Sequence, residues 1–180
     1  YPIILAAAGA PTDWSVFAMK APGGLALLLL AFATWSLCRT YVGRGIAAIA
    51  TLAVTLQPAV VLDANYFGSD VPFTAVSALV LAIIFRQLAR IEAGHPPGAG
   101  LLLAAAVLST VAFSIRSNGA VLPCTYLFGV GLLALRGRLP WATAIRHGVA
   151  FGAATGALIG LYFAVLPDGT PVVLLEVDDL

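Results

Sequence analysis

Six long apolar runs are the feature that most limits what this chain can fold into. They cover residues 22–37, 45–62, 71–88, 99–115, 119–135 and 148–166. A helix crosses a bilayer with about 20 predominantly apolar residues. The chain carries 9% charged residues, against about 25% in a soluble domain. We therefore predict an all-α, polytopic transmembrane helix bundle of about six to seven spans, folded as a single domain over residues 1–180.

The beginning of the chain indicates a fragment of a longer protein. It opens at Tyr1 without an initiator methionine, and no charged segment typical of a signal peptide precedes the first apolar residues. Residues 1–10 are apolar but too short to cross a bilayer alone. We expect them to be the end of a helix that starts earlier in the full protein.

Charged residues sort between alternate turns. One set of turns holds basic residues: Arg39, Arg44, Arg86, Arg90, Arg136, Arg138 and Arg146. The other turns and the tail hold acidic residues: Asp13, Asp63, Asp70, Asp168, Glu176, Asp178 and Asp179. By the positive-inside rule the basic turns are cytoplasmic. The loops with Asp63, Asp70 and Arg116 are then extracytoplasmic.

The composition also bears on location and partners. Alanine, leucine and glycine are abundant, and eight of the nine basic residues are arginines, which is typical of a GC-rich bacterial gene. We therefore predict a multi-pass protein of the plasma (inner) membrane, in contact with membrane lipids. The net charge of +1 gives no reason to expect a nucleic-acid partner.

Arg116 and Lys20 are basic residues on the predicted acidic side. Arg116 ends an apolar run and is followed by Ser117, Asn118 and Gly119. A guanidinium binds phosphate through a planar fork, Ser117 and Asn118 add donors, and the next helix start attracts anions. Lys20 can add positive charge. The alternative is an arginine that extends to the interface and pairs with Asp63 or Asp70; both interpretations are open.

The turn between residues 62 and 71 is the second polar candidate. Gln57-Pro58 precedes it and should kink the helix. Ser69 or Asp70 suits the N-cap of the next helix, with Pro72 in its first turn. Asp63 and Asp70 are also candidate catalytic residues, which could orient a sugar hydroxyl, hold a divalent cation or take a proton. Tyr66 lies between them.

Glycines recur every four residues in the last apolar run, at Gly148, Gly152, Gly156 and Gly160. Such a ridge lets another helix approach closely, so we predict a helix-packing partner there. Cys38 and Cys124 lie near opposite ends of different predicted spans, too far apart for a disulfide. We predict two free thiols and no metal site at the histidines.

The order of these motifs resembles one enzyme family. Arg116-Ser117-Asn118-Gly119, between two apolar helices, is similar to the Arg-Ser-Asn-Gly segment of the GPI mannosyltransferase II family and its bacterial relatives, in the GT-C superfamily of membrane glycosyltransferases. Gln57-Pro58 corresponds to the family's Asn/Phe-Pro helix end. Residues 69–73 fit its Ser-Glu-x-x-Phe turn, with Asp70 in place of the glutamate. The resemblance covers roughly residues 56–135, and Tyr66 stands two residues further from the acid than in the family.

The resemblance implies transfer of a sugar, mannose in that family, from a polyprenyl-phosphate donor on the extracytoplasmic face. It assigns Arg116, Ser117, Asn118, Lys20 and Tyr66 to substrate binding. It also implies a catalytic acid in an outer loop before Tyr1. The alternative functions are a transporter or flippase for lipid-linked sugars, which would place charges near the bilayer midplane, and a purely structural membrane subunit.

Overall fold

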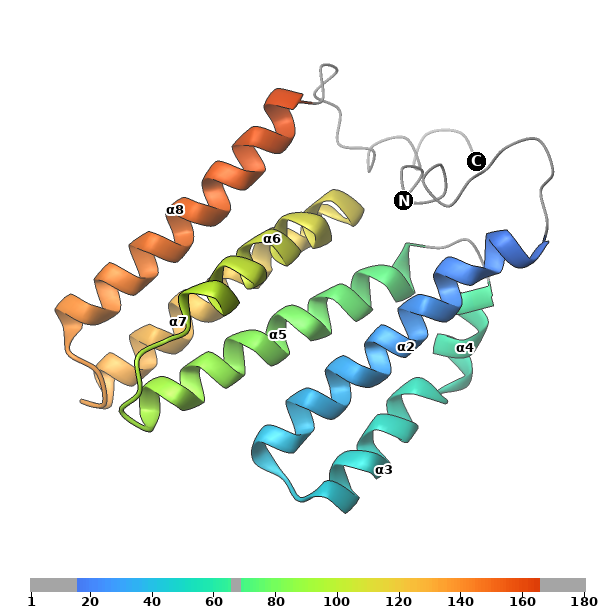
Figure 1. The fold of residues 1–180 in the computed structure, drawn as a ribbon, viewed down its shortest axis with the longest axis horizontal. Helices are drawn as coiled ribbons and strands as arrows, with labels where there is room; N and C mark the ends of the chain where they lie inside the picture. Colours follow the sequence, from blue (N-terminus) through green and yellow to red (C-terminus); the bar gives the residue numbers. More distant parts are fainter. Residues whose placement is uncertain (1–15, 66–68, 166–180) are drawn as a thin grey trace. The chain divides into compact units, whose positions relative to one another are not determined.

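The computed structural model describes residues 16–65 and 69–165, and every regular element in these ranges is a helix. In chain order these are α2 (Val16–Tyr41), α3 (Arg44–Thr55), α4 (Pro58–Asn65), α5 (Asp70–Glu92), α6 (Ala99–Ile115), the 3₁₀ helix η1 (Ser117–Val121), α7 (Leu122–Leu135) and α8 (Trp141–Val165) (Figure 1). The predicted all-α class is confirmed for this part of the chain.

Four helical segments are long and apolar enough to cross a membrane: Ala21–Tyr41, Asp70–Glu92, Ser117–Leu135 and Trp141–Val165. The pair α3 and α4 passes the same test together, with a bend of 52° between its halves. α6 has 17 residues, so it is about 25 Å long, slightly less than the roughly 30 Å hydrocarbon core. The described residues thus contain four candidate spans, or five with the bent pair, and the predicted six to seven are not confirmed.

The predicted boundaries hold for α6 and differ for α8. The helix over residues 99–115 begins and ends where the apolar run does. α8 begins at Trp141, seven residues before the predicted start at Gly148, because the amides of Thr143 and Ala144 both donate to the Pro140 carbonyl at 3.0 Å. The prediction that Arg146 lies in a turn is therefore wrong, since it lies inside α8. It is wrong in the same way for Arg39, near the end of α2, and for Arg86 and Arg90, near the end of α5, because these helices continue past the apolar runs.

The described chain divides into two compact units, Tyr1–Leu79 and Val80–Leu180. In the first unit, α2 packs against α3 and α4. Alanines and one leucine face inward on α2, namely Ala26, Leu30 and Ala33, whereas Leu25, Leu28 and Phe32 are exposed. Large apolar side chains outside and small ones between helices are typical of packing in a lipid environment.

In the first unit, α2 and α4 approach each other closely at Gly23. A Cβ atom added at Gly23 would overlap the backbone carbonyl of Ala64. Ala26, Leu30, Ala64, Val71 and Ala75 form the apolar cluster beside this contact. Glycine at position 23 therefore sets the distance between the two helices.

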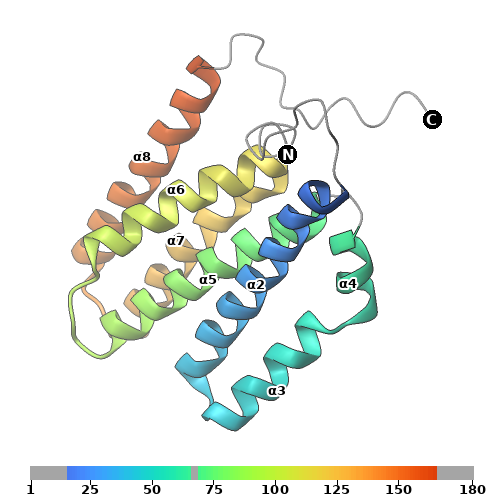
Figure 2. The same cartoon turned by 45° about the vertical axis from the view of Figure 1, so that its right-hand side comes forward.

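In the second unit, α8 packs against both α6 and α7 (Figures 1 and 2). Tyr126 of α7 meets Phe151 of α8 with ring centroids 4.8 Å apart. The ring of Phe113 near the end of α6 packs edge-to-face against the rings of Tyr162 and Phe163 near the end of α8. The ring centroids are 6.1 and 5.8 Å apart. α6 and α7 contact each other less than each contacts α8, so α8 holds the unit together.

The connections α5–α6 and α7–α8 lie at one end of the second unit and the α6–α7 connection lies at the other (Figures 1 and 2). We name the first the basic end, since its helix ends and connections carry Arg86, Arg90, Arg136, Arg138 and Arg146. Glu92 is the acidic residue at this end. Both turns are closed by a glycine with positive φ, Gly94 at 79° and Gly137 at 68°. Five of the predicted basic residues thus lie at one end of this unit, whereas the predicted acidic residues of the other side lie outside its described part.

Candidate functional site

Arg116 lies at the end of α6, at the opposite end of the second unit from the basic end. α6 ends at Ile115, and Arg116 is extended, with φ −149° and ψ 136°. Its amide still donates to the Ala112 carbonyl at 2.9 Å, which completes the helix. Arg116, Ser117 and Asn118 are all exposed. Three consecutive polar side chains are therefore presented together at this corner.

Gly119 decides the shape of that corner. It is buried, and a Cβ atom there would overlap the backbone of Ala112 and Phe113 in the last turn of α6. Its amide donates to the Arg116 carbonyl at 2.9 Å, so the chain turns back directly over the end of α6. A tight turn thus connects α6 to η1 and α7. The two helices it joins are antiparallel, although α8, rather than direct contact between them, supplies most of their packing.

The turn also limits which groups are available to an anion. The amide of Gly119 is already bonded to Arg116, and that of Leu122 donates to the Gly119 carbonyl. Pro123 in the first turn of α7 has no N–H. An anion at this corner would therefore be bound by the side chains of Arg116, Ser117 and Asn118 rather than by the first amides of α7.

Asp63 and Asp70 lie on either side of the α4–α5 junction, in the first unit. Asp63 is exposed within α4, and Asp70 is exposed as the first residue of α5. The Ser69 carbonyl accepts the Phe73 amide at 2.9 Å, which leaves Ser69 at the N-cap position and Asp70 in the first turn. A carboxylate there stabilises the helix start, so one structural role of Asp70 is already explained.

The structure describes the other candidate site residues, Asn65, Tyr66 and Lys20, only in part. The amide nitrogen of Asn65 donates to the Val61 carbonyl at 2.8 Å, so it is used in its own helix. Tyr66 lies outside the described residues. Lys20 lies in α2, one turn before Gly23, and its side chain is outside the described part. Within the ranges that the structure describes, no three His, Cys, Asp or Glu side chains are grouped as a metal site would require.

The predicted proline break is confirmed. α3 ends at Thr55 and Pro58 begins α4, at an angle of 52°. Pro58 lacks the N–H that would continue the helix, and its ring excludes a helical carbonyl four residues before it. The break leaves an interrupted span rather than a continuous helix.

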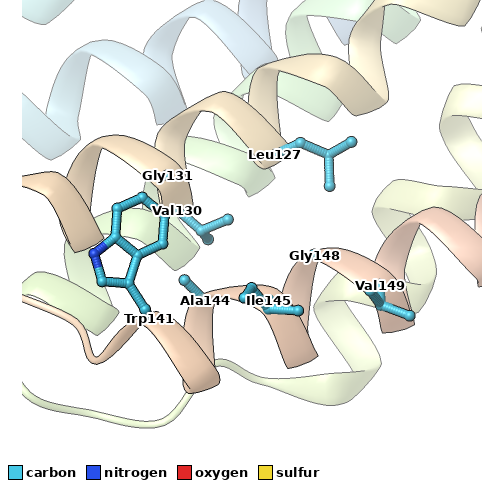
Figure 3. A pocket seen from close by; sticks show the side chains of 8 residues that line it. All are labelled: Leu127, Val130, Gly131, Trp141, Ala144, Ile145, Gly148 and Val149. Carbon is cyan, nitrogen blue, oxygen red and sulfur yellow. The ribbon is translucent and has the colours of Figure 1, made fainter.

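Two apolar grooves beside α8 were not predicted. One lies between α7 and α8, has a volume of about 440 Å³, and is lined by Leu127, Val130, Gly131, Trp141, Ala144, Ile145, Gly148 and Val149 (Figure 3). The other, between α6 and α8, has about 250 Å³ and includes His147 and Phe151. Neither is lined by Arg116. The small residues Gly131, Ala144 and Gly148 are the sequence signal for the first groove, but they mark it only once α7 and α8 are known to pack together.

The predicted glycine ridge is mostly unoccupied in the described chain. A Cβ atom at Gly148 would lie 3.4 Å from a methyl group of Leu127, whereas at Gly152, Gly156 and Gly160 it would meet nothing within 4 Å. A packing partner for the ridge stays a prediction. Cys38 and Cys124 are both free thiols, as predicted.

The Arg116 corner belongs to the second unit, and the two aspartates belong to the first. The structure therefore brings Arg116, Ser117 and Asn118 together, and it separately brings Asp63 and Asp70 to one junction. No protein-family model, curated protein or solved structure matches this chain.

Proposed function

We propose that this chain is part of a membrane glycosyltransferase that moves a sugar, mannose by resemblance, from a polyprenyl-phosphate donor to an acceptor on the extracytoplasmic face. The observation that carries the proposal is the exposed run Arg116-Ser117-Asn118 at the end of the second unit away from its other arginines. A positive charge is disfavoured on the translocated side of a membrane protein. A guanidinium kept there is explained by an anionic substrate.

The proposed role of Arg116 is electrostatic. As the glycosidic bond breaks, negative charge accumulates on the phosphate of the leaving polyprenyl phosphate, and a fixed cation beside it lowers the barrier. Ser117 and Asn118 supply hydrogen bonds to the same oxygens, and Lys20 adds positive charge. Gly119 supports this role because its buried position keeps the turn closed against α6.

Asp63 and Asp70 are proposed to orient the sugar or acceptor, or to hold a divalent cation, with Tyr66 contributing to substrate binding. By the family resemblance, the catalytic base is an acidic residue in an outer loop before Tyr1. The two aspartates then bind and position substrate rather than accept the reacting proton.

The test is transfer of radiolabelled sugar from a polyprenyl-phosphate donor by membranes that contain the full-length protein. Arg116→Ala should lower turnover about 100- to 1,000-fold, the usual loss when a transition-state donor is removed. Arg116→Lys should be intermediate, because it keeps the charge and loses the planar fork.

Arg90→Ala is the matched control, since Arg90 is an exposed arginine of the same unit in the last turn of α5. It should retain near-normal turnover at equal protein level. Normal turnover in a well-inserted Arg116→Ala protein would refute the assignment.

One observation favours a transporter as the second candidate. The α3–α4 pair is an apolar helix interrupted by a 52° bend, and transporters use interrupted helices at their substrate sites. A flippase would move the intact lipid-linked sugar between leaflets and leave the sugar–phosphate bond whole. Labelled donor that changes leaflet without releasing sugar would favour this candidate over the transferase.

A further inference from the structure

The groove between α7 and α8 is an apolar channel that lies toward the basic end of the second unit (Figure 3). Gly131 lines the groove without a side chain, and a Cβ atom added there would meet nothing within 4 Å. Its rim residues Trp141, Ile145 and Val149 are 54, 60 and 65% exposed. The groove is therefore open along its length, and its lining is apolar apart from the indole N–H of Trp141.

Its dimensions suit one lipid chain. From Trp141 to Val149 the groove follows eight residue steps of α8, which is about 12 Å at 1.5 Å per residue. One leaflet of the hydrocarbon core is about 15 Å deep, half of the roughly 30 Å total. An acyl chain that begins at Trp141 would thus lie in the groove for most of a leaflet.

The end of the groove at Trp141 is positively charged. The connection from α7 to α8 carries Arg136 and Arg138, and both are exposed. The connection is also fixed in shape, because the Gly137 amide donates to Ala134 at 3.0 Å and the Arg138 amide to Leu133 at 2.9 Å. This paired closure of a helix end positions both arginines on the α7 C-terminus. An apolar ligand that reaches this end gains affinity if its head carries negative charge.

We propose that this groove is a binding site for an anionic phospholipid, with an acyl chain between α7 and α8 and the phosphate at Arg136 and Arg138. Charge favours this occupant over a second protein helix, because such a helix would have to bring acidic residues to these two arginines, whereas a phospholipid brings its phosphate. The tryptophan at the junction of chain and head group is typical of a membrane interface. This site is distinct from the proposed polyprenyl-phosphate site at Arg116, which lies at the other end of the unit.

The test uses Trp141 as the reporter. A protein with Trp14→Phe and Trp35→Phe retains Trp141 as its single tryptophan. It is reconstituted into phosphatidylcholine vesicles that contain, at equal mole fraction, either phosphatidylglycerol or phosphatidylcholine with brominated acyl chains. Bromine quenches tryptophan at contact. Brominated phosphatidylglycerol should show about tenfold stronger relative binding, since each arginine near a membrane surface favours anionic lipid.

Two variants separate the groove from the charge. Gly131→Leu fills the groove and should remove the preference, whereas Gly100→Leu is the matched control. Gly100 is an exposed glycine of α6 whose added Cβ atom also meets nothing. Replacing Arg136 and Arg138 by glutamine should bring the two lipids to near parity.

Each alternative result overturns the proposal. Equal quenching by both lipids would mean no anionic site. A phosphatidylglycerol preference that survives Gly131→Leu would mean attraction by surface charge without a groove. Quenching that rises for both lipids as the protein is diluted in the membrane would mean that a second copy of the chain occupies the groove.

Discussion

Gly23 and Gly24 are adjacent glycines of α2 with opposite surroundings. Gly23 is buried and faces the backbone carbonyl of Ala64, whereas Gly24 is exposed and has nothing within 4 Å of an added Cβ atom. The same substitution to alanine therefore has two different consequences within one helical turn. This pair tests whether the contact between α2 and α4 is as close as the structure has it.

Two opposing contributions determine the expected change in the free energy of unfolding. Alanine gains about 0.5–1 kcal/mol over glycine inside a helix. Overpacking costs about 1–3 kcal/mol, and we take the upper end at Gly23 because a backbone carbonyl cannot rotate away. The free energy of unfolding of Gly23→Ala should thus fall by about 2 kcal/mol, because overpacking costs about 3 kcal/mol and the alanine contributes about 1 kcal/mol. The free energy of unfolding of Gly24→Ala should rise by about 0.5–1 kcal/mol.

Thermal unfolding in detergent micelles measures both changes. At about 2–4 °C per kcal/mol for a chain of this size, Gly23→Ala should lower Tm by about 4–8 °C and Gly24→Ala should raise it by about 1–4 °C. A thiol-reactive fluorophore reports unfolding through the half-buried Cys38 once Cys124 is replaced by serine. Equal Tm values for the two variants, or a Gly23→Ala protein as stable as the parent, would refute the predicted contact.

Two further predictions concern the second unit. Tyr126 is fully buried, and its hydroxyl has no hydrogen-bond partner among the described residues. Tyr126→Phe should therefore raise the free energy of unfolding by about 1 kcal/mol. Tyr126→Ala should lower it by about 3–5 kcal/mol, because the ring contact with Phe151 is lost. A lower Tm for Tyr126→Phe would mean that the hydroxyl has a partner. Asn118→Cys, in a protein without other cysteines, should react with a membrane-impermeant maleimide from outside intact cells, whereas Arg138→Cys should react only after permeabilisation. The reverse pattern would invert the predicted topology and remove the basis for an extracytoplasmic Arg116 site.

Much of the local architecture follows from the sequence. The apolar run of residues 99–115 coincides with α6, since an uninterrupted apolar helix needs no outside partner to complete its hydrogen bonds. Pro58 starts a new helix and Gly94 and Gly137 close the basic turns, because their backbone chemistry allows few alternatives. The Arg116-Ser117-Asn118 corner was also predictable, since its residues are consecutive.

Which helix faces pack together was harder to predict from the sequence. The four-residue spacing of Gly148, Gly152, Gly156 and Gly160 is the clearest small-residue pattern in the chain, yet the glycines in closest contact are Gly23, Gly119 and Gly129. An added Cβ atom at Gly129 would overlap the Leu88 side chain. Spacing shows that a helix can be approached closely, but it does not show from which side a neighbour comes.

The start of α8 shows the same limit. Arg146 and the apolar boundary near residue 148 favoured a helix start at Gly148, but the Pro140 carbonyl already begins the helix at Trp141. Charge pattern marks where a chain leaves the hydrocarbon core, and a helix extends past that point wherever its backbone bonds continue.

Hydropathy, proline and glycine act within a few residues, so the sequence was enough to predict that the described chain is helical and where its helix breaks at Pro58. Which glycines lie in close contact, that α8 bridges α6 and α7, and that a groove opens beside the α7–α8 connection became clear only from the packing of the helices. These features depend on distances between residues remote in the chain, and in a membrane protein apolar side chains do not mark which faces pack, since lipid and neighbouring helices are equally apolar.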